Sequence, residues 1–418
     1  MKDPAVIDAA ALENMIVPRF LAYVRVCTTS DSRSETTPTS EGQWDLARML
    51  EEELKRLGAA EVTLTGACYV IARIPASVGK EGAPVIGFMA HLDTSPDAPG
   101  ADVQPVLVRN YDGRRIALDA GIALDPALDA DLAAQTGRDI IHTSGATLLG
   151  ADDKAGIAEI MGAVEFLLLH PEISHGPLEI IFTPDEETGK GLPQFPVSRL
   201  RAETCYTLDG GPEGELEIEC FNAYGVDVHF QGKVIHPGTA RGIMLNAALM
   251  SSVYAAMLPR SESPEATDGY YGYYCLTRIQ GNHEEALAEF ILRDFSRDGI
   301  DRRLAAMDAF ARAVEAQFPG GTVTVTAKPQ YFNMREKIET RPAALEKLKT
   351  AAERVGINFL LKPIRGGTDG SRLTELGIPT PNIFTGGRNF HSRSEWISVP
   401  EMTAACRLII ELAREWAG

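Results

Sequence analysis

The stretch PLEIIFTPDEETGKG, residues 177–191, decides the fold that we expect for this chain. Its first half is a mostly apolar run with the length and β-branched content of a buried strand. Three acidic residues, Asp185, Glu186 and Glu187, follow it directly and lead into a glycine-containing turn. Adjacent carboxylates repel one another and raise the cost of ionisation. Nearby cations would offset that repulsion, so the crowding indicates a metal site at the end of a strand.

The neighbouring segments follow the same plan of strands alternating with helices. Residues 83–97 and 203–211 each contain a strand-like run that ends in polar residues. Residues 39–59 place leucines on one helical stripe and end at Gly58, which suits a C-cap. Residues 146–169 form a turn that enters a helix. This alternation predicts an α/β fold in which the chemistry lies at the strand ends.

The length of 418 residues predicts more than one domain. Near Cys220 the pattern changes to alternating strands with two helices, at 245–258 and 299–318, and the first style returns after residue 331. We therefore expect a catalytic domain formed by residues 1–219 and 332–418, interrupted by an α+β domain over residues 220–331.

The charge balance and the apolar segments restrict the partners. The chain has 58 acidic and 40 basic residues, a net charge of −18, whereas nucleic acids and anionic membranes need a basic face. Asp3, Asp8 and Glu13 interrupt the N-terminal segment where a signal peptide would be apolar. The most apolar window, 160–169, is too short to cross a bilayer. Six cysteines without a C-x-x-C pair predict reduced thiols and a cytoplasmic location.

Two loops offer histidines of the kind that bind metals. His91 follows the strand-like run at 83–90, and Asp93 lies two residues later on the same side of an extended chain. That spacing suits a histidine ligand whose second nitrogen is held by a carboxylate, although a solvated turn would show the same pattern. His391 lies among glycines and polar residues, which argues against a histidine packed in an apolar core.

Two further loops offer carboxylates. Asp152 and Asp153 open the helix at 146–169, where N-terminal capping is an equally good explanation. Asp209 ends a strand before two glycines, where a plain turn is the simpler interpretation of that residue alone.

Taken together, these loops fit a pair of metal ions that share one carboxylate. Two such ions can clamp both oxygens of a hydrolytic transition state. Five ligands, one of them shared, give each ion three, and a sixth, unligated carboxylate can take a proton from the water between them. Spacing alone leaves open whether Asp152 or Asp153 is the shared ligand, and whether Glu186 or Glu187 is the base.

Eight motifs, in order along nearly the whole chain, resemble one family. They are HLDTSPD (91–97), TLLGADDKAGIAEIM (147–161), FTPDEETGKG (182–191), HPGTARGIMLNA (236–247), ILRDFSR (291–297), NMREK (333–337), PIRGGTDGSRL (363–373) and NIFTGGRNFH (382–391). This set is similar to the peptidase T aminotripeptidases of the M20 metallopeptidase group. The resemblance implies a di-zinc catalytic α/β domain, with a mixed central sheet flanked by helices and interrupted by a smaller lid domain. It also implies release of the N-terminal residue from tripeptides.

The resemblance assigns roles to the residues of the metal loops. It gives one Zn²⁺ to His91, Asp152 and Asp209, and the other to Asp152, Glu187 and His391. Glu186 becomes the general base, and Asp93 becomes the residue that orients His91. Ligands of this type also accept Co²⁺ or Mn²⁺. No role follows for Asp185, which we expect to be a loop cap or a solvated charge.

Four residues are candidates for contacts with the peptide substrate. By resemblance, His236 stabilises the oxyanion of the tetrahedral intermediate, and Asn246 follows it in the lid; a structural turn before Pro237 is the alternative for His236. Arg293 and Arg365 could bind a carboxylate or carbonyl of the substrate. For Arg293 an ordinary ion pair with its neighbour is the alternative.

The remaining alternatives are another M20-type activity and a non-catalytic peptide-binding protein. The first includes dipeptidases, carboxypeptidases and N-acyl amino-acid amidases. The sequence departs from the family pattern at Ser392 and in the acidic loop 118–137, which bear on substrate fit. Monomer and homodimer both stay open.

Overall fold

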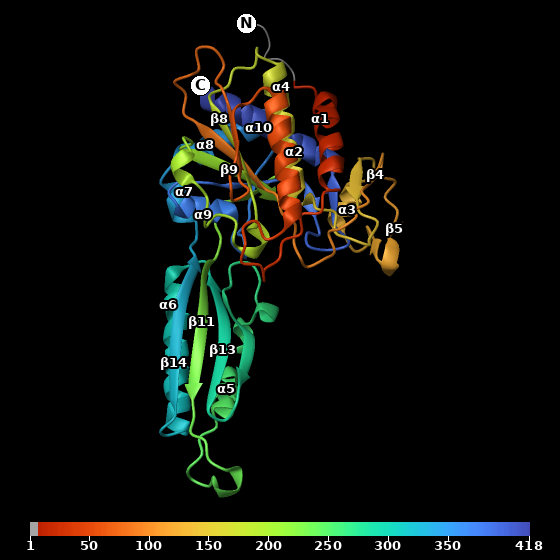
Figure 1. The fold of residues 1–418 in the computed structure, drawn as a ribbon. Helices are drawn as coiled ribbons and strands as arrows, with labels where there is room; N and C mark the ends of the chain where they lie inside the picture. The colour runs from red at the N-terminus through yellow and green to blue at the C-terminus, as the bar shows by residue number, and fades with distance from the viewer. Residues whose placement is uncertain (1–6) are drawn as a thin grey trace. The chain divides into compact units, whose positions relative to one another are not determined.

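The computed structural model describes residues 7–418; the first six residues, which include Asp3 of the N-terminal segment, lie outside it. The chain forms two compact units. The larger unit comprises the chain up to Ile218 together with Glu336–Lys362 and Thr368–Gly418. The smaller unit, green to cyan in Figure 1, comprises Glu219–Arg335 and Pro363–Gly367. It thus extends beyond the expected range 220–331.

The short second segment of the smaller unit is bound to its first residue. The backbone N–H of Ile364 donates to the carbonyl of Glu219 at 2.9 Å. This contact explains why a segment more than a hundred residues later in the sequence belongs to the same unit, which the local sequence pattern does not reveal.

The larger unit is built on a mixed eight-stranded sheet. In spatial order its strands are β1 (Ala60–Leu64), β2 (Val70–Ile74), β8 (Leu178–Thr183), β3 (Ile86–His91), β9 (Thr204–Gly210), β16 (Asn382–Phe384), β10 (Glu215–Glu217) and β15 (Leu360–Leu361). The four strands from β8 to β16 run parallel to one another, and the outer pairs β1–β2, β2–β8 and β16–β10 are antiparallel.

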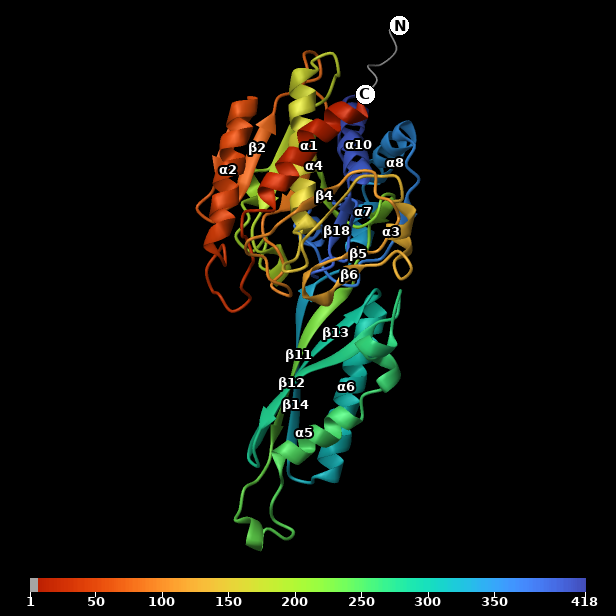
Figure 2. The same cartoon turned by 90° about the vertical axis from the view of Figure 1, so that its right-hand side faces the viewer.

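The central strands are nearly continuous apolar runs, because other parts of the larger unit cover both faces of the sheet. Every residue of β3 and β8 is buried. On one face α4 packs against β3 and β9, with α1 and α10 beside it (Figure 2). On the other face a cluster that includes Leu192, Phe195 and Leu373 packs against Met89 and Ile181. The sheet is therefore the core on which the strand-end loops are fixed.

The helices and the remaining strands of the larger unit frame this sheet. The helices are α1 (Ala9–Tyr23), α2 (Glu41–Leu57), α3 (Ala130–Ala134), α4 (Ala151–Leu169), α7 (Arg335–Glu339), which begins at the last residue of the smaller unit, α8 (Pro342–Val355), α9 (Asp369–Glu375) and α10 (Val399–Ala417). A second sheet has the order β17 (Gly387–Arg388), β18 (Trp396–Ser398), β7 (Ile140–His142) and β4 (Val106–Val108). A hairpin joins β5 (Ile116–Ala117) to β6 (Ala123–Leu124).

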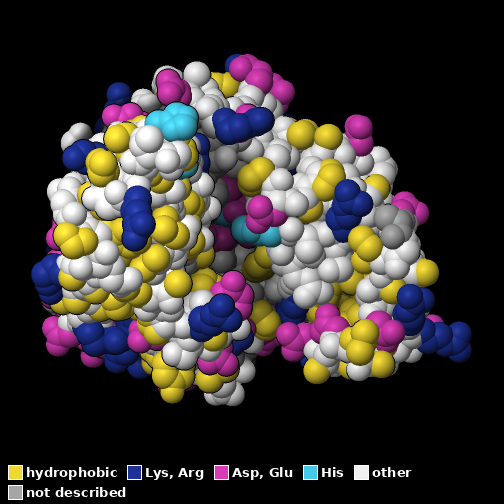
Figure 3. Space-filling view, turned by 90° about the horizontal axis from the view of Figure 1, so that it is seen from below, with side chains coloured by type: hydrophobic (Ala, Val, Ile, Leu, Met, Phe, Trp, Pro, Cys, Tyr) yellow, Lys and Arg dark blue, Asp and Glu magenta, His cyan; other side chains and the backbone are white. Residues whose placement is uncertain are grey.

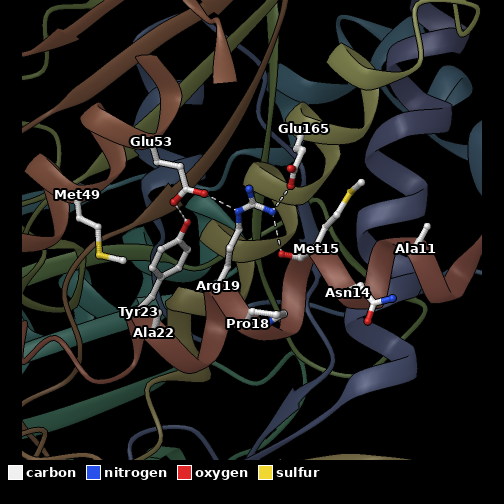
Figure 4. Close-up of a pocket in the computed structure, with 10 residues that line it drawn as sticks. All are labelled: Ala11, Asn14, Met15, Pro18, Arg19, Ala22, Tyr23, Met49, Glu53 and Glu165. Atoms are coloured by element: carbon white, nitrogen blue, oxygen red, sulfur yellow. Dashed lines mark hydrogen bonds and ion pairs between the residues drawn. The ribbon is translucent and has the colours of Figure 1, made fainter. Parts of the chain in front are cut away.

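A partly buried ion-pair network connects three of these helices. Arg19 of α1 donates to Glu53 of α2 at 2.7 Å and to Glu165 of α4 at 2.6 Å. The hydroxyl of Tyr23 donates to the second oxygen of Glu53 at 2.7 Å. These groups line a groove of about 480 Å³ whose other walls include Met15 and other apolar side chains (Figure 4). Because Arg19 has a partner on each of the two neighbouring helices, these contacts fix the position of α1 against α2 and α4.

The smaller unit is a four-stranded antiparallel sheet with two helices on one face. The strand order is β12 (Tyr273–Gly281), β13 (Glu285–Asp294), β11 (Asn222–Gln231) and β14 (Thr322–Tyr331), and the helices are α5 (Ala247–Ala256) and α6 (Arg297–Gln317). Alternate residues of β11, such as Val226, Val228 and Phe230, are buried against Met250 and Met307 of these helices. The opposite alternation leaves the other side of each strand more exposed.

Three features relate to the expectations about nucleic acids, membranes and thiols: the surface charge, the apolarity of the helices and the burial of the cysteines. On the face drawn in Figure 3, Lys and Arg side chains lie in small, separate groups among acidic and apolar ones. Over residues 7–418, the helices all lack the combination of length and apolarity that crossing a bilayer requires. Cys68, Cys205 and Cys406 are free thiols in the core, whereas Cys27 is exposed.

Candidate metal centre

The carboxylate of Asp152 lies between two histidines of the larger unit. Its Oδ1 is 2.8 Å from Nε2 of His91, and its Oδ2 is 3.1 Å from Nε2 of His391. Each of these ring nitrogens also faces a second carboxylate: His91 Nε2 is 3.5 Å from Oδ1 of Asp209, and His391 Nε2 is 3.0 Å from Oε2 of Glu187. The five residues thus form two groups of three that share Asp152 and that could each hold a metal ion.

The sheet explains why these residues meet. His91 is the last residue of β3, Asp209 lies at the end of β9, and Glu187 follows β8 after a short turn. The carboxyl ends of parallel neighbouring strands meet at one edge of a sheet, where α/β proteins bind ligands. Asp152 and His391 approach that edge from α4 and from the turn after β17.

The structure separates Asp152 from Asp153, which spacing alone does not. Gly150 occupies the cap position of α4, and both aspartates have non-helical backbone angles, so neither caps the helix in the expected way. The side chain of Asp152 contacts the two histidines, whereas Oδ2 of Asp153 accepts the backbone N–H of His91 at 3.1 Å. The two neighbours therefore have different partners.

The second nitrogen of each histidine has its own oxygen partner. Nδ1 of His91 is 3.0 Å from the carbonyl oxygen of Asp93 and 3.4 Å from its carboxylate, and Nδ1 of His391 is 3.3 Å from Oδ2 of Asp97. A hydrogen bond at Nδ1 fixes the ring and leaves Nε2 as the metal-binding atom. For His91 the nearer partner is the backbone of Asp93 rather than its carboxylate.

The carboxylate of Asp93 has a different set of donors. Its Oδ1 accepts the backbone N–H of Glu186 at 3.0 Å, and its Oδ2 accepts that of Glu187 at 3.2 Å. Asp93 is fully buried. Asp93 therefore fixes the turn that carries Glu186 and Glu187, and it also lies beside His91.

The electrostatics of the centre show an excess of buried negative charge. Burial, and then Asp152, raise the pKa of Glu187 to about 8, and burial raises that of Asp209 to about 6. Hydrogen bonds to Asp152 and Glu187 raise the pKa of His391 to about 11. Oε1 of Glu187 is buried without a hydrogen-bond partner. An imidazole and two carboxylates per group are donors suited to a divalent cation, so these residues fit two metal ions.

The side chain of Glu186 belongs to neither group, and its charged neighbours include His91 and Asp209 of the first group and Glu187 of the second. Burial raises its pKa well above the ordinary value; His91 opposes this shift, and Asp209 and Asp369 add to it. An acidic group in such surroundings holds a proton readily, which is the property that general acid–base chemistry uses.

The comparisons with known proteins agree with this geometry. A sequence model of peptidase family M20/M25/M40 matches residues 143–415. This chain belongs to that family. Peptidase T of Geobacillus sp. (strain WCH70) is 47% identical over 405 residues, which cover 96% of this chain and 98% of the relative. Peptidase T of Clostridium perfringens (strain SM101 / Type A) is 47% identical over 399 residues, with the same coverage.

Solved structures of the family share the fold. The aminopeptidase PepT of Bacillus cereus superposes on this M20 peptidase with a TM-score of 0.76 and 25% identity, over 97% of this chain and 99% of the other. A dinuclear metal-binding peptidase of the M20 family from Bacillus subtilis gives a TM-score of 0.66 at 15% identity, over 97% and 98% of the two chains. The second likeness is one of fold alone.

The expectation for Asp185 was wrong. Asp185 is fully buried rather than solvated, and although it precedes the helical turn Glu186–Thr188, its side chain makes no capping hydrogen bond there. Its carboxylate accepts the backbone N–H of Thr39 at 2.8 Å, the hydroxyl of Thr39 at 2.6 Å and the amide of Gln43 at 2.8 Å. The three adjacent acids of this M20 peptidase therefore differ: one ties the turn to the start of α2, and two face the centre.

Sequence reasoning missed two buried acids beside the centre. Asp369, at the start of α9, accepts the hydroxyl of Thr183 at 2.5 Å, and Thr183 pairs with His91 in neighbouring strands. Burial raises the pKa of Asp369 to about 7. Glu395 lies four residues after His391 and accepts three backbone N–H groups. In the sequence, the segment GGTDG drew attention through Arg365, and HSRSE through His391 and Ser392. The acids in these segments, Asp369 and Glu395, were the one signal of a position beside the centre.

The candidate substrate residues on the loop and helix of the smaller unit have local partners. Nδ1 of the exposed His236 accepts the N–H of Gly238 at 3.1 Å. In the neutral ring the proton then resides on Nε2, which makes that atom a donor. Asn246 is the N-cap of α5 and accepts the N–H of Leu249 at 3.2 Å.

The two candidate arginines differ in how their donors are used. The guanidinium carbon of Arg293 lies 5.4 Å from the ring centre of Tyr331, and the guanidinium donates to the carbonyl of Leu292. The neighbouring Asp294 pairs with Arg303 instead. The alternative of an ion pair between Arg293 and its neighbour was therefore wrong. Arg365 donates to the carbonyls of residues 267, 269 and 271, which engages much of its guanidinium within the smaller unit.

Proposed function

We propose that this chain is a two-metal aminopeptidase that releases the N-terminal residue from tripeptides. The observation that carries the proposal is the position of the Asp152 carboxylate, with one oxygen on His91 and the other on His391. Relatives that match almost the whole chain are named Peptidase T, and a solved structure of the same fold is described as an aminopeptidase.

We assign one metal ion to His91, Asp152 and Asp209, and the other to Asp152, Glu187 and His391. Zinc suits these donors, and Co²⁺ or Mn²⁺ are possible substitutes. When bound, two such cations polarise the scissile carbonyl and lower the pKa of a water molecule between them.

In this proposal Glu186 moves the proton. Its carboxylate takes a proton from the attacking water and later donates it to the nitrogen of the leaving amine. The environment that raises its pKa suits a group that must hold the proton between these two steps. Asp93 supports this role, because it accepts the backbone N–H groups of Glu186 and Glu187 and so fixes the turn.

For the substrate, we propose that Nε2–H of His236 donates to the oxygen that becomes negative in the transition state. Arg293 would bind a carboxylate of the peptide. Asn246 and Arg365 would act indirectly, because their polar groups cap α5 and hold residues 267–271. We also propose that the enzyme acts in the cytoplasm, where its buried thiols would stay reduced.

A substrate panel combined with one variant tests the proposal. Purified protein loaded with Zn²⁺ should release the N-terminal residue from tripeptides faster than it cleaves dipeptides, C-terminal residues or N-acetyl amino acids. Glu186→Gln should lower kcat about 10²–10⁴-fold and still bind two metal ions by elemental analysis. Glu172→Gln, at an exposed position beyond α4, is the matched control and should keep full activity. No release from any tripeptide would reject the aminotripeptidase assignment.

A further inference from the structure

Glu395 is a buried acid whose side chain contacts the loop that carries Asp152. Oε2 of Glu395 accepts the backbone N–H of Leu149 at 2.7 Å and that of Gly150 at 2.8 Å. Oε1 accepts the backbone N–H of Asp152 itself at 3.1 Å. The side chain is 1% exposed. All three partners are donors, so this geometry requires an acceptor at both oxygens.

The backbone of Glu395 is tied just as closely to the turn of His391. Its N–H donates to the carbonyl of Ser392 at 3.3 Å, and the hydroxyl of Ser392 donates to the carbonyl of Asn389 at 2.6 Å. The next residue, Trp396, begins β18, which pairs with β7 in the second sheet. Ser392, one of the departures from the family pattern, thus helps to close the turn.

These two sets of contacts join two loops that are more than 230 residues apart in sequence. One loop ends in Asp152, which touches both histidines, and the other begins with His391. We infer that Glu395 is a positioning residue that sets the Asp152 carboxylate relative to His391, and through it the shape of both metal-binding groups. This inference rests on the proposed two-metal function.

The physical reason is the cost of buried N–H groups. Without the carboxylate, three backbone donors of the loop before α4 lose their acceptor in the interior, where no water replaces it. The loop would then move to find other partners, and the Asp152 carboxylate would move with it. Partners that orient a metal ligand typically change metal affinity about 10–100-fold when they are removed.

Glu395→Gln is the most selective variant. An amide offers one oxygen and one NH₂ group, so it can satisfy the N–H groups of Leu149 and Gly150 but then places a donor against the N–H of Asp152. The change keeps the size of the side chain and disturbs the contact to the metal ligand.

The chain offers a matched control in Glu179. This carboxylate is also fully buried, and its Oε2 accepts the backbone N–H groups of Arg201 and Ala202, both at 2.9 Å. Its Oε1 accepts from the guanidinium of Arg73 at 3.0 Å, so both oxygens face donors. It lies near the start of β8, whereas the acidic turn follows the end of that strand. Glu179→Gln therefore makes the same chemical change in a similar setting, without touching a metal ligand.

The test measures metal binding directly, below the unfolding temperature of each variant. Zinc affinity is obtained by competition with a chelating dye, and the absorption spectrum of the Co²⁺-loaded protein reports the geometry of the ligands. Glu395→Gln should bind zinc about 10–100-fold more weakly than the wild type and give an altered Co²⁺ spectrum. Glu179→Gln should lower the unfolding temperature but keep the wild-type affinity and spectrum.

Three outcomes would overturn the inference. Wild-type zinc affinity in Glu395→Gln would show that the contact to Asp152 does not shape the centre. An equal loss of affinity in Glu179→Gln would show that the effect is general destabilisation. A wild-type protein that binds no metal at all would overturn the proposed function first, so failure of the function and failure of the positioning role are told apart.

Discussion

Asp185 and Gln43 hold each other by two hydrogen bonds across 142 residues of sequence. The amide of Gln43 donates to Oδ1 of Asp185 at 2.8 Å, and the N–H of Asp185 donates to the amide oxygen of Gln43 at 3.1 Å. Both residues are fully buried. This reciprocal pair fastens the turn that carries Glu186 and Glu187 to the first turns of α2.

Asp185→Asn should destabilise the protein and slow catalysis. The carboxylate faces only donors, from Thr39 and Gln43, and an asparagine would turn an NH₂ group toward at least one of them. We expect a loss of about 1–3 kcal/mol in the free energy of unfolding, measured in urea. Because the turn also carries Glu186, kcat should fall as well.

The control for this variant is Asp112→Asn, an exposed aspartate that accepts a single backbone N–H in its own loop. It should change neither the unfolding free energy nor kcat. Equal stability of the two variants would contradict the anchoring role of Asp185.

The loops that form the centre could be predicted from the sequence because each ends a strand or begins a helix with an acid or histidine. Apolar runs such as residues 178–183 indicate buried strands. Parallel neighbouring strands then place their carboxyl ends, and the residues that follow them, at one edge of the sheet. Spacing alone could not decide between Asp152 and Asp153, because both open the same helix. Their side-chain partners separate them: Asp152 faces the two histidines, and Asp153 accepts the backbone N–H of His91. Glu395 was missed for another reason: its partners lie about 240 residues earlier, and no local pattern records them.

The neighbouring aspartates give a matched pair of variants. Asp152→Asn removes a charge that faces both histidines, and it should abolish binding of at least one metal ion together with activity. Asp153→Asn keeps an oxygen that can accept the N–H of His91. The other oxygen of Asp153, Oδ1, is buried without a hydrogen-bond partner, and burial raises the pKa of this carboxyl well above its ordinary value, so the change to an amide disturbs little. We expect Asp153→Asn to bind two metal ions, measured by elemental analysis after dialysis. Loss of both ions in Asp153→Asn alone would reverse the assignment.

The free energy of unfolding of the metal-free protein should fall as pH rises. Glu187 has a folded pKa of about 8 against an ordinary 4.5, and His391 about 11 against 6.5. Both shifts are upward, so the folded metal-free protein binds more protons than the unfolded chain from about pH 4.5 to about pH 11, and its stability decreases over that window. Metal ions compete with these protons, so their affinity increases with pH.

Thermal unfolding at pH 6 and pH 8, with and without a chelator, checks this prediction. The difference between metal-loaded and metal-free unfolding temperatures should be larger at pH 8. At a hundred times its Kd, each metal ion adds about 2.7 kcal/mol. Activity should be lost with the metal and return with Zn²⁺, Co²⁺ or Mn²⁺. A difference that shrinks from pH 6 to pH 8 would contradict the prediction.

Glu159 on α4 is a candidate for stabilising the protein by substitution. It is fully buried, and neither carboxyl oxygen has a hydrogen-bond partner. Burial raises its pKa well above the ordinary value, so its folded form holds a proton that the unfolded chain releases above about pH 4.5. It therefore destabilises the fold increasingly as pH rises from that value. Glu159→Met should raise the unfolding free energy by about 1–3 kcal/mol at pH 7, and by less at pH 4.

Glu165→Met, on the same helix, separates this effect from a general benefit of methionine in α4. Glu165 pairs with Arg19 at 2.6 Å, so its loss leaves a half-buried guanidinium with one carboxylate fewer. We expect Glu165→Met to lower the unfolding free energy at pH 7, because breaking a partly buried pair costs more than the pair contributes. Urea unfolding of both variants at pH 4 and pH 7 decides the matter. A loss of stability in Glu159→Met that is as large as the loss in Glu165→Met would mean that Glu159 has a partner that stabilises it.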